Sequence, residues 1–264
     1  MSLLDIFKKE ERTGLVLGGG GVRGFFHMGV IKALRELKVE INEISGTSIG
    51  ALVAAIYAAD PDVDFEKLID ELDYLKISQI IASAFDSKGS ERLERFLKNY
   101  MKVNNFNEFK IPIRFNAVDI NNYREVVFEE GEIFPGIIAS MSIPGVFPVV
   151  EYNKSYLVDG GVLNNVPVNN LKNCQRIIIS DITGPIKKID GKTNKMDVLY
   201  SSIAIMQKYH AVETLKASKE IRSKQLICVT LEDNETNILD LRITNFKKLF
   251  DMGYKSMMSK QMEL

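Results

Sequence analysis

A single serine between small residues marks the stretch of this sequence best suited to chemistry. Ser48 has Gly46 two positions before it and Gly50 two positions after it, within the run ISGTSIGAL of residues 44–52. An apolar helical pattern follows directly, which predicts a strand, a sharp turn and a helix. Gly-x-Ser-x-Gly in that context is the nucleophile elbow, in which the glycines relieve the crowding of a strained turn. We therefore predict that Ser48 is a nucleophile.

A glycine-rich loop precedes this stretch. Residues 18–24 read GGGGVRG, after the apolar run Leu15–Leu17 and before a helical pattern that begins near Phe26. A loop between a strand and a helix can point its backbone N–H groups at an anion. Two functions fit: the loop could hold a phosphate, or it could be the oxyanion hole of an acyl-transfer reaction.

The spacing Gly19-x-Gly21-x-x-Gly24 also matches the dinucleotide-binding fingerprint. That fingerprint requires an acidic residue at the end of the next strand, about 20 residues further on. The next predicted strand instead runs into the serine turn, and no Gly-Lys-Ser/Thr follows the loop as a P-loop would require. Both patterns favour an oxyanion hole over a nucleotide site.

A serine hydroxyl needs a base to activate it. Asp159 ends a predicted strand and is followed by Gly160 and Gly161, which allow close approach to another loop. Burial beside a serine would raise the pKa of this carboxyl above its usual ~3.9. Asp-Gly is also a common turn, so the residue could be purely structural. Because three glycine-flanked features each follow a strand, we expect them to converge at the carboxyl edge of one sheet.

The two histidines offer an alternative base. The chain order Ser48, Asp159, His210 matches the triad order of the α/β-hydrolases. His210 lies in the middle of a predicted helix, whereas a triad histidine usually lies on a loop. His27 follows the glycine loop by three residues and could support that loop or be structural.

Strands alternate with helices along the whole chain, which predicts a single α/β domain over residues 1–264 with a largely parallel sheet. An apolar stripe at helical spacing within residues 64–101 belongs to the core, lines an acyl-chain pocket or touches a lipid surface. Its members are Ile77, Ile80, Ile81, Ala84 and Phe85. The other expected elements are a hairpin over 111–128, helices over 133–141, 196–221 and 238–262, and strands over 156–158, 176–180 and 226–231.

Composition narrows the class of protein. The chain has 264 residues, is 45% hydrophobic and 26% charged, and carries a net charge of -1, so no global field indicates a nucleic-acid partner. Cys174 and Cys228 lie in apolar contexts typical of reduced thiols, which suits the cytoplasm. No run approaches the ~20 apolar residues of a membrane span. Residues 1–9 show no signal peptide; they could form a packed terminal helix or a short interfacial anchor.

Four motifs together resemble the patatin-like phospholipases, a family of lipid acyl hydrolases. The likeness spans about residues 13–183, and residues 196–262 carry no signature. The motifs occur in the family's order and at similar separations, and they are Gly19-Gly20-Gly21-Val22-Arg23-Gly24, Gly46-Thr47-Ser48-Ile49-Gly50, Ala139-Ser140 through Pro144 to Phe147-Pro148-Val149, and Asp159-Gly160-Gly161.

The resemblance implies a three-layer α/β/α fold and a Ser48–Asp159 dyad that works without a histidine. It also implies an oxyanion hole from the amides of Gly19, Gly20 and Gly21, with Arg23 and Gly24 supporting that loop. No metal or other cofactor is implied. The expected reaction is ester hydrolysis of a phospholipase A or lysophospholipase type on a phospholipid or another acyl lipid, with peripheral membrane contact.

Two other functions remain open from the sequence. One is a soluble carboxylesterase or thioesterase with a Ser-Asp-His triad. The other is a catalytically silent fold that binds lipid or protein. Oligomeric state, head-group preference and acyl-chain preference are not determined by these motifs.

Overall fold

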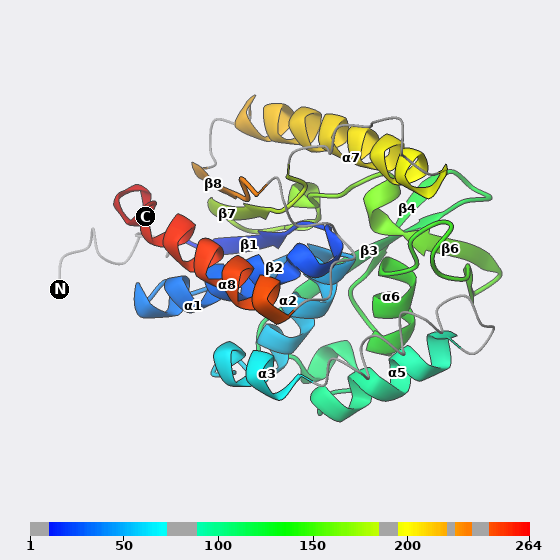
Figure 1. The fold of residues 1–264 in the computed structure, drawn as a ribbon, viewed down its shortest axis with the longest axis horizontal. Helices are drawn as coiled ribbons and strands as arrows, with labels where there is room; N and C mark the ends of the chain where they lie inside the picture. The colour runs from blue at the N-terminus through cyan, green and yellow to red at the C-terminus, as the bar shows by residue number, and fades with distance from the viewer. Residues whose placement is uncertain (1–10, 73–88, 185–194, 221–224, 234–242) are drawn as a thin grey trace, which may run out of the picture.

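The structure is a computed structural model that describes residues 11–72, 89–184, 195–220, 225–233 and 243–264 (Figure 1). Two expectations lie wholly outside these residues. They concern residues 1–9 and the apolar stripe from Ile77 to Phe85.

A mixed sheet forms the centre of the described fold. Its strands run in the order β5-β6-β3-β2-β1-β7-β8, and β4 pairs with β3. The five strands β3, β2, β1, β7 and β8 are mutually parallel, whereas β4, β5 and β6 join antiparallel at one end. The largely parallel sheet is confirmed, and β5 is a strand that the sequence pattern missed. The strands are β1 (Thr13–Leu17), β2 (Glu43–Thr47), β3 (Ile113–Asp119), β4 (Arg124–Phe128), β5 (Val150–Tyr152), β6 (Ser155–Asp159), β7 (Arg176–Asp181) and β8 (Gln225–Thr230).

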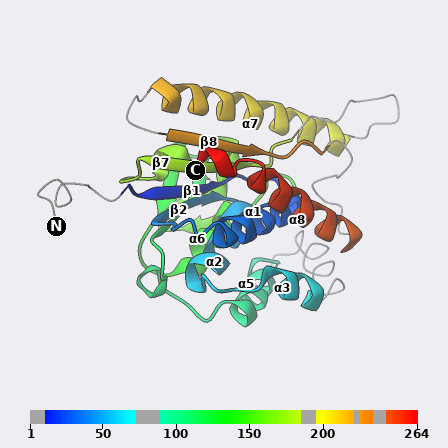
Figure 2. The same ribbon diagram turned by 90° about the vertical axis from the view of Figure 1, so that its left-hand side faces the viewer.

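Helices cover both faces of this sheet, which completes the predicted three layers. Figure 2 shows α7 on one face and α1, α2 and α8 on the other, with α3 and α5 beyond α2. The helices are α1 (Phe25–Glu36), α2 (Ile49–Ala59), α3 (Phe65–Glu71), α5 (Gly89–Tyr100), α6 (Ile133–Ser140), α7 (Lys195–Glu220) and α8 (Ile243–Met258). None of these described helices combines the length and the apolar composition that crossing a membrane requires.

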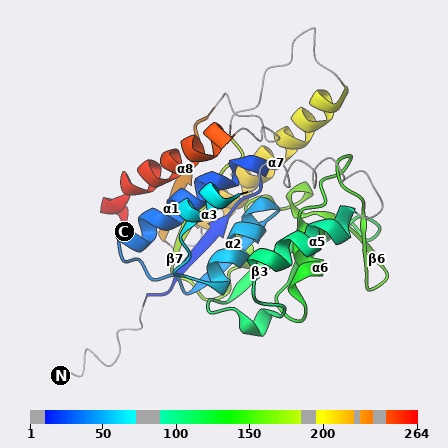
Figure 3. The same cartoon turned by 60° about the horizontal axis from the view of Figure 1, so that its bottom comes forward.

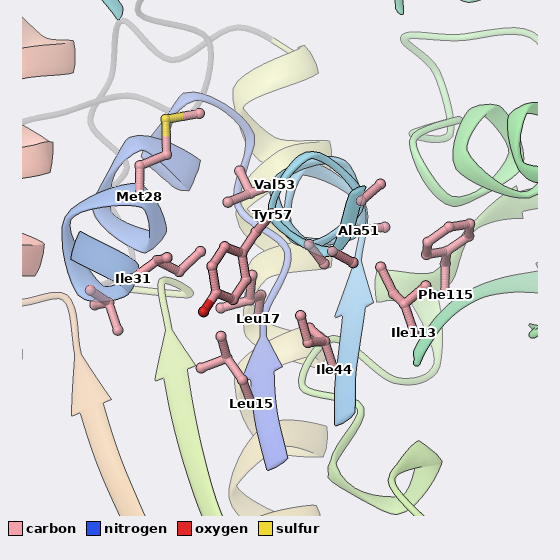
Figure 4. Close-up of a cluster of buried hydrophobic side chains, with 14 of the residues drawn as sticks. Leu15, Leu17, Met28, Ile31, Ile44, Ala51, Val53, Tyr57, Ile113 and Phe115 are labelled. Carbon is pink, nitrogen blue, oxygen red and sulfur yellow. The ribbon is translucent and has the colours of Figure 1, made fainter. Parts of the chain in front are cut away.

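The strands alternate their side chains between two apolar clusters. Leu15 and Leu17 belong to the larger cluster under α1 and α2, while Val16 belongs to the smaller one that α7 covers through Ala211. This follows from the two-residue period of a strand. Figure 4 shows the larger cluster, where Tyr57 lies beside Leu15 and Leu17.

The C-terminal helix packs directly on the helix that follows the glycine loop. Figure 3 shows α8 alongside α1. The two helices approach at Gly29 and Gly253, where an added Cβ would overlap the main-chain oxygens of Phe250 and Phe26. The region without sequence signatures is therefore built into the main core. Cys174 is buried, Cys228 is half-buried, and neither forms a disulfide in the part of the chain described.

Candidate active site

Ser48 occupies a strained turn between β2 and α2. Its φ of 55° and ψ of -125° lie in a region that non-glycine residues rarely adopt. The glycines on each side make the turn possible: a Cβ on Gly46 would lie 2.6 Å from the Gly50 carbonyl oxygen, and a Cβ on Gly50 would overlap the Leu17 carbonyl oxygen. The predicted strand, turn and helix are present, with Ser48 only 5% exposed.

The strand arrangement that places Asp159 beside Ser48 differs from the predicted one. We expected both residues at the carboxyl edge of a parallel sheet, but β6 runs antiparallel to β3. Register brings the two residues together: Thr47 lies beside Asn116 of β3, and Asp159 lies beside Ala117, the next residue of the same strand. The Asp159 carboxyl consequently lies close enough to the Ser48 hydroxyl for that hydroxyl to lower its pKa.

The surroundings of Asp159 suit a base that works near neutral pH. Its side chain is buried, and Oδ1 accepts a hydrogen bond from the Gly161 amide at 2.7 Å. Burial raises the pKa of Asp159 to about 6, against the opposing effect of the hydrogen bonds from Ser48 and Gly161. Loss of hydration disfavours the charged carboxylate, so the group holds a proton more strongly than an exposed aspartate.

Ser140 supports Ser48 through a contact that the sequence did not reveal. Its hydroxyl oxygen accepts the Ser48 amide hydrogen at 2.8 Å, from the last residue of α6. Beyond the same helix, the Ser142 carbonyl accepts the Asp159 amide hydrogen at 2.9 Å. The segment after α6 thus holds the main chains of both members of the pair. Its sequence motif marked the segment but gave no role to these serines.

The glycine loop lies against Ser48. A Cβ on Gly19 would lie 3.3 Å from the Ser48 Cβ. The Gly19 amide is already engaged, because it donates to the Asn165 carbonyl at 3.1 Å. Among the described residues, the amides of Gly20 and Gly21 have no hydrogen-bond acceptor. Of the three amides expected to form an oxyanion hole, those two can still donate to a ligand.

Arg23 and Gly24 hold the far side of this loop. Arg23 is buried, and its Nη1 donates to the Thr183 carbonyl at 2.7 Å. Burial lowers the pKa of the guanidinium, while the nearby charge of Asp233 opposes that shift. Gly24 packs on Ile49 of α2, where an added Cβ would overlap the Ile49 side chain. The loop is therefore fixed against the segment after β7 and against α2.

His27 supports the glycine loop from behind. The ring is fully buried, with Nε2 2.8 Å from the Gly18 carbonyl oxygen and Nδ1 2.7 Å from the Ser180 hydroxyl. A carbonyl can only accept, so Nε2 carries the proton and Nδ1 accepts from Ser180. Burial lowers the pKa of His27 to about 4, so the ring is neutral at pH 7.

His210 does not join the Ser48–Asp159 pair in the described structure. It lies half-buried on α7 with its ring edge against Tyr209, and the groups that act on the pKa of Asp159 are Ser48 and the Gly161 amide. Helix α7 approaches the aspartate motif through Gln207 instead, whose Nε2 would lie 2.5 Å from a Cβ on Gly161. The geometry offers Asp159 as the partner of Ser48.

Ser48 lines an apolar cavity of about 190 Å³. Along α2, the residues Ile49, Leu52 and Ile56 line it at increasing distance from the serine. Segments far apart in sequence complete the wall, with Leu93, Phe96, Leu97 and Tyr100 from α5, Met141, Ile143 and Phe147 from the segment after α6, and Phe246 from α8. Such a cavity accommodates a hydrocarbon chain whose polar end lies at the serine.

Comparison with known proteins agrees with this geometry. A family model described as patatin-like phospholipase matches residues 15–172. Lysophospholipase NTE1 of Candida albicans is 34% identical over an alignment of 195 positions, which covers 70% of this chain and 14% of that protein. An uncharacterized NTE family protein of Mycobacterium bovis is 33% identical over 162 residues, covering 60% of this chain and 45% of that protein. The chain thus spans less than half the length of these relatives.

A solved structure shows the same fold. The crystal structure of VipD from Legionella pneumophila superposes with a TM-score of 0.51 at 16% identity, covering 95% of this chain and 67% of that one. At that identity the likeness concerns the fold alone. The family model, in contrast, extends over more than half of the sequence and includes the glycine loop, the serine turn and the aspartate motif. The chain belongs to the patatin-like phospholipase family.

Proposed function

We propose that this chain is a serine lipid acyl hydrolase in which Ser48 is the nucleophile and Asp159 the base. One observation carries the proposal: the Ser48 hydroxyl acts on a buried carboxylate and also lines an apolar cavity. The glycine loop beside Ser48 supplies the amides of Gly20 and Gly21 as an oxyanion hole. Gly19 shapes the loop but donates its own amide to Asn165.

The first half of the reaction acylates the serine. Asp159 accepts the Ser48 proton while Oγ attacks the ester carbonyl carbon. Negative charge moves to the carbonyl oxygen, where the Gly20 and Gly21 amides stabilise it, each donor contributing about 3 kcal/mol. The tetrahedral intermediate collapses as Asp159 returns the proton to the leaving alcohol, which departs as a lysolipid or a glycerophospho-alcohol.

The second half of the reaction releases the fatty acid. Water enters where the alcohol left and gives its proton to Asp159 as it attacks the acyl carbonyl. The same amides stabilise the second oxyanion, and the proton then returns to Ser48 Oγ. A carboxyl with a pKa of about 6 suits both directions of transfer, because neither protonation state is strongly disfavoured near neutral pH.

The cavity indicates which part of the substrate binds inside. Its walls are apolar side chains from α1, α2, α5 and α8, so it suits a fatty acyl chain, with the head group left outside. Phospholipid and lysophospholipid esters fit this division, and the NTE1 relatives are named as lysophospholipases. Because such lipids are held in membranes, the proposal includes peripheral contact with a membrane surface.

Fluorophosphonate labelling of four proteins tests the dyad. Wild type and His210→Ala should both label, whereas Ser48→Ala and Asp159→Asn should not. Wild type should also release fatty acid from lysophosphatidylcholine. Circular dichroism of each variant serves as the folding control.

Other outcomes would point to the alternative functions. Labelling that is lost in a folded His210→Ala variant would move the chain to the triad esterases. Wild-type protein that neither labels nor hydrolyses lipid would indicate a binding module.

A further inference from the structure

Asn165 lies in the loop that follows Asp159, and it is hydrogen-bonded to the glycine loop at two points. Its main-chain oxygen accepts the Gly19 amide hydrogen at 3.1 Å, and its side-chain Nδ2 donates to the Gly19 carbonyl at 3.2 Å. Asn165 lies six residues after Asp159 and is 1% exposed. One residue of the segment that carries the base therefore holds both polar groups of a glycine beside the nucleophile.

The orientation of the Asn165 amide follows from its partners. Nδ2 also lies 3.1 Å from the Thr183 Oγ1, and that hydroxyl donates its own hydrogen to Asp181 Oδ1 at 2.6 Å. Thr183 Oγ1 can therefore only accept from Asn165, as can the Gly19 carbonyl. Both acceptors require the NH₂ group, so Oδ1 points away from the Gly19 carbonyl and the Thr183 hydroxyl.

Oδ1 then lies between two glycines of the site. A Cβ on Gly19 would lie 2.5 Å from this oxygen, and a Cβ on Gly161 would lie 2.7 Å from it. The oxygen is buried and has no hydrogen-bond partner in the described structure. A buried acceptor without a partner costs folding free energy. Asn164 Oδ1 shares this feature, so what distinguishes the Asn165 oxygen is its position between the two glycine loops.

We propose that Asn165 is a positioning residue that sets the spacing between the glycine loop and the Asp159-Gly160-Gly161 motif. Its amide acts as a spacer, bonded to Gly19 on one side and in contact with Gly161 on the other. The spacing aligns the Gly20 and Gly21 amides with the oxyanion formed on a substrate attacked by Ser48. This inference rests on the proposed function and extends it to a residue outside the dyad.

The alignment matters because oxyanion stabilisation depends on distance. Donors must lie about 2.7–3.1 Å from the position that the oxyanion takes in the transition state. A displacement of about 1 Å can reduce a rate by roughly 100-fold. Loss of the spacer should therefore lower kcat, while KM changes little because the acyl cavity is untouched.

The test compares Asn165→Ala with Asn164→Ala. Asn164 is a matched control: it is also buried, but its Nδ2 donates to Glu125 and Asn169, and its side chain makes no hydrogen bond to the glycine loop within the described residues. Two readouts are needed for both variants. One is kcat and KM for p-nitrophenyl butyrate, counted per fluorophosphonate-labelled site. The other is amide hydrogen exchange of peptides covering residues 18–24.

We expect Asn165→Ala to lower kcat by about 10- to 100-fold with KM nearly unchanged, and to speed exchange in the glycine loop. Asn164→Ala should keep wild-type kcat and loop exchange even if its melting temperature falls. Equal kcat and equal loop exchange in the two variants would overturn the proposal. If Asn165→Ala does not fold, Asn165→Ser replaces it, because serine is too short to reach the Gly19 carbonyl.

The exchange readout separates this inference from the proposed function. A wild-type protein without hydrolysis or labelling would contradict the hydrolase proposal. In that case faster loop exchange in Asn165→Ala alone would still support the spacer, and exchange equal to that of Asn164→Ala would still refute it.

Discussion

Ser140 holds the main chain of Ser48, because its hydroxyl oxygen accepts the Ser48 amide hydrogen at 2.8 Å and both residues are buried. The two residues are 92 positions apart in the sequence. Ser48 has an unfavourable φ, so its conformation depends on surrounding contacts of this kind. The end of α6 thereby stabilises the strained turn that presents the Ser48 side chain.

Replacing this acceptor should weaken both stability and turnover. Ser140→Ala leaves the buried Ser48 amide without a partner, which should lower the free energy of unfolding by about 1–3 kcal/mol. We expect kcat to fall roughly tenfold because the hydroxyl is no longer held in place. Ser45→Ala is the control, since that buried serine donates to the Pro167 carbonyl and not to the turn. Equal kcat in the two variants would contradict the assigned role.

The rate of acylation should depend on pH through Asp159. The carboxyl accepts a proton only when ionised, and its pKa is raised to about 6. The second-order rate of fluorophosphonate labelling should therefore increase as pH rises from about 5 to 7 and become constant above that range. Stopped-time labelling across this range measures it. A midpoint near pH 4, typical of an exposed aspartate, would be incompatible with a buried base.

The raised pKa of Asp159 also means that this residue lowers the free energy of unfolding at neutral pH. The group binds its proton more tightly in the folded state, so its contribution is favourable at low pH and is lost as pH rises through 6. Asp159→Asn should then be inactive but more stable than wild type at pH 7, by up to about 3 kcal/mol. The difference should vanish below about pH 4.

Urea titrations at pH 7 and at about pH 4 measure the free energy of unfolding of each variant. Asp119→Asn serves as a control in which we expect the opposite change in stability. Hydrogen bonds from Ser155 and Asn122 lower the pKa of Asp119. Its ionised form therefore stabilises the fold above the usual aspartate pKa, and the substitution should destabilise the protein at pH 7. An Asp159→Asn variant that is as destabilised as Asp119→Asn would rule out a raised pKa for Asp159.

His27 should lower the stability of the protein as the pH falls from about 6.5 to 4, a range in which protonation of Asp159 raises it. The buried ring has a pKa of about 4, so the unfolded chain binds more protons below the usual pKa of 6.5. Stability from this group is present above 6.5 and is lost as pH falls through 4, by about 3 kcal/mol in total. The effect should be clearest in Asp159→Asn, whose stability no longer rises on acidification. Adding His27→Gln to that variant should flatten the profile.

Chain-length preference should respond to one side chain in the cavity. Ile56 lies eight residues after Ser48, about 12 Å along the axis of α2, and lines the cavity. Ile56→Trp should fill the distal part, lowering kcat/KM at least tenfold for a p-nitrophenyl ester with a 16-carbon chain. The four-carbon ester should be hydrolysed as by wild type. A uniform loss for both esters would show that the acyl chain binds elsewhere.

Local patterns predicted most of the elements because the forces that form them are local. The turn at Ser48, the hairpin of β3 and β4, and helices α6 and α7 lie within a few residues of their expected limits. Apolar periodicity and glycine positions are enough for such assignments. The strand β5 was missed, because three residues after a proline-rich turn carry too little periodic signal.

Residue types and order in the sequence alone determined the candidate nucleophile, the candidate base and the glycine loop. Tertiary structure decided how they meet. The antiparallel register of β6 on β3 places Asp159 at the level of Ser48. The engagement of the Gly19 amide by Asn165, and the wall that α5 and α8 give the cavity, arise between segments up to about 200 residues apart. Such partners depend on how whole elements pack, and packing is a property that no short window of sequence contains.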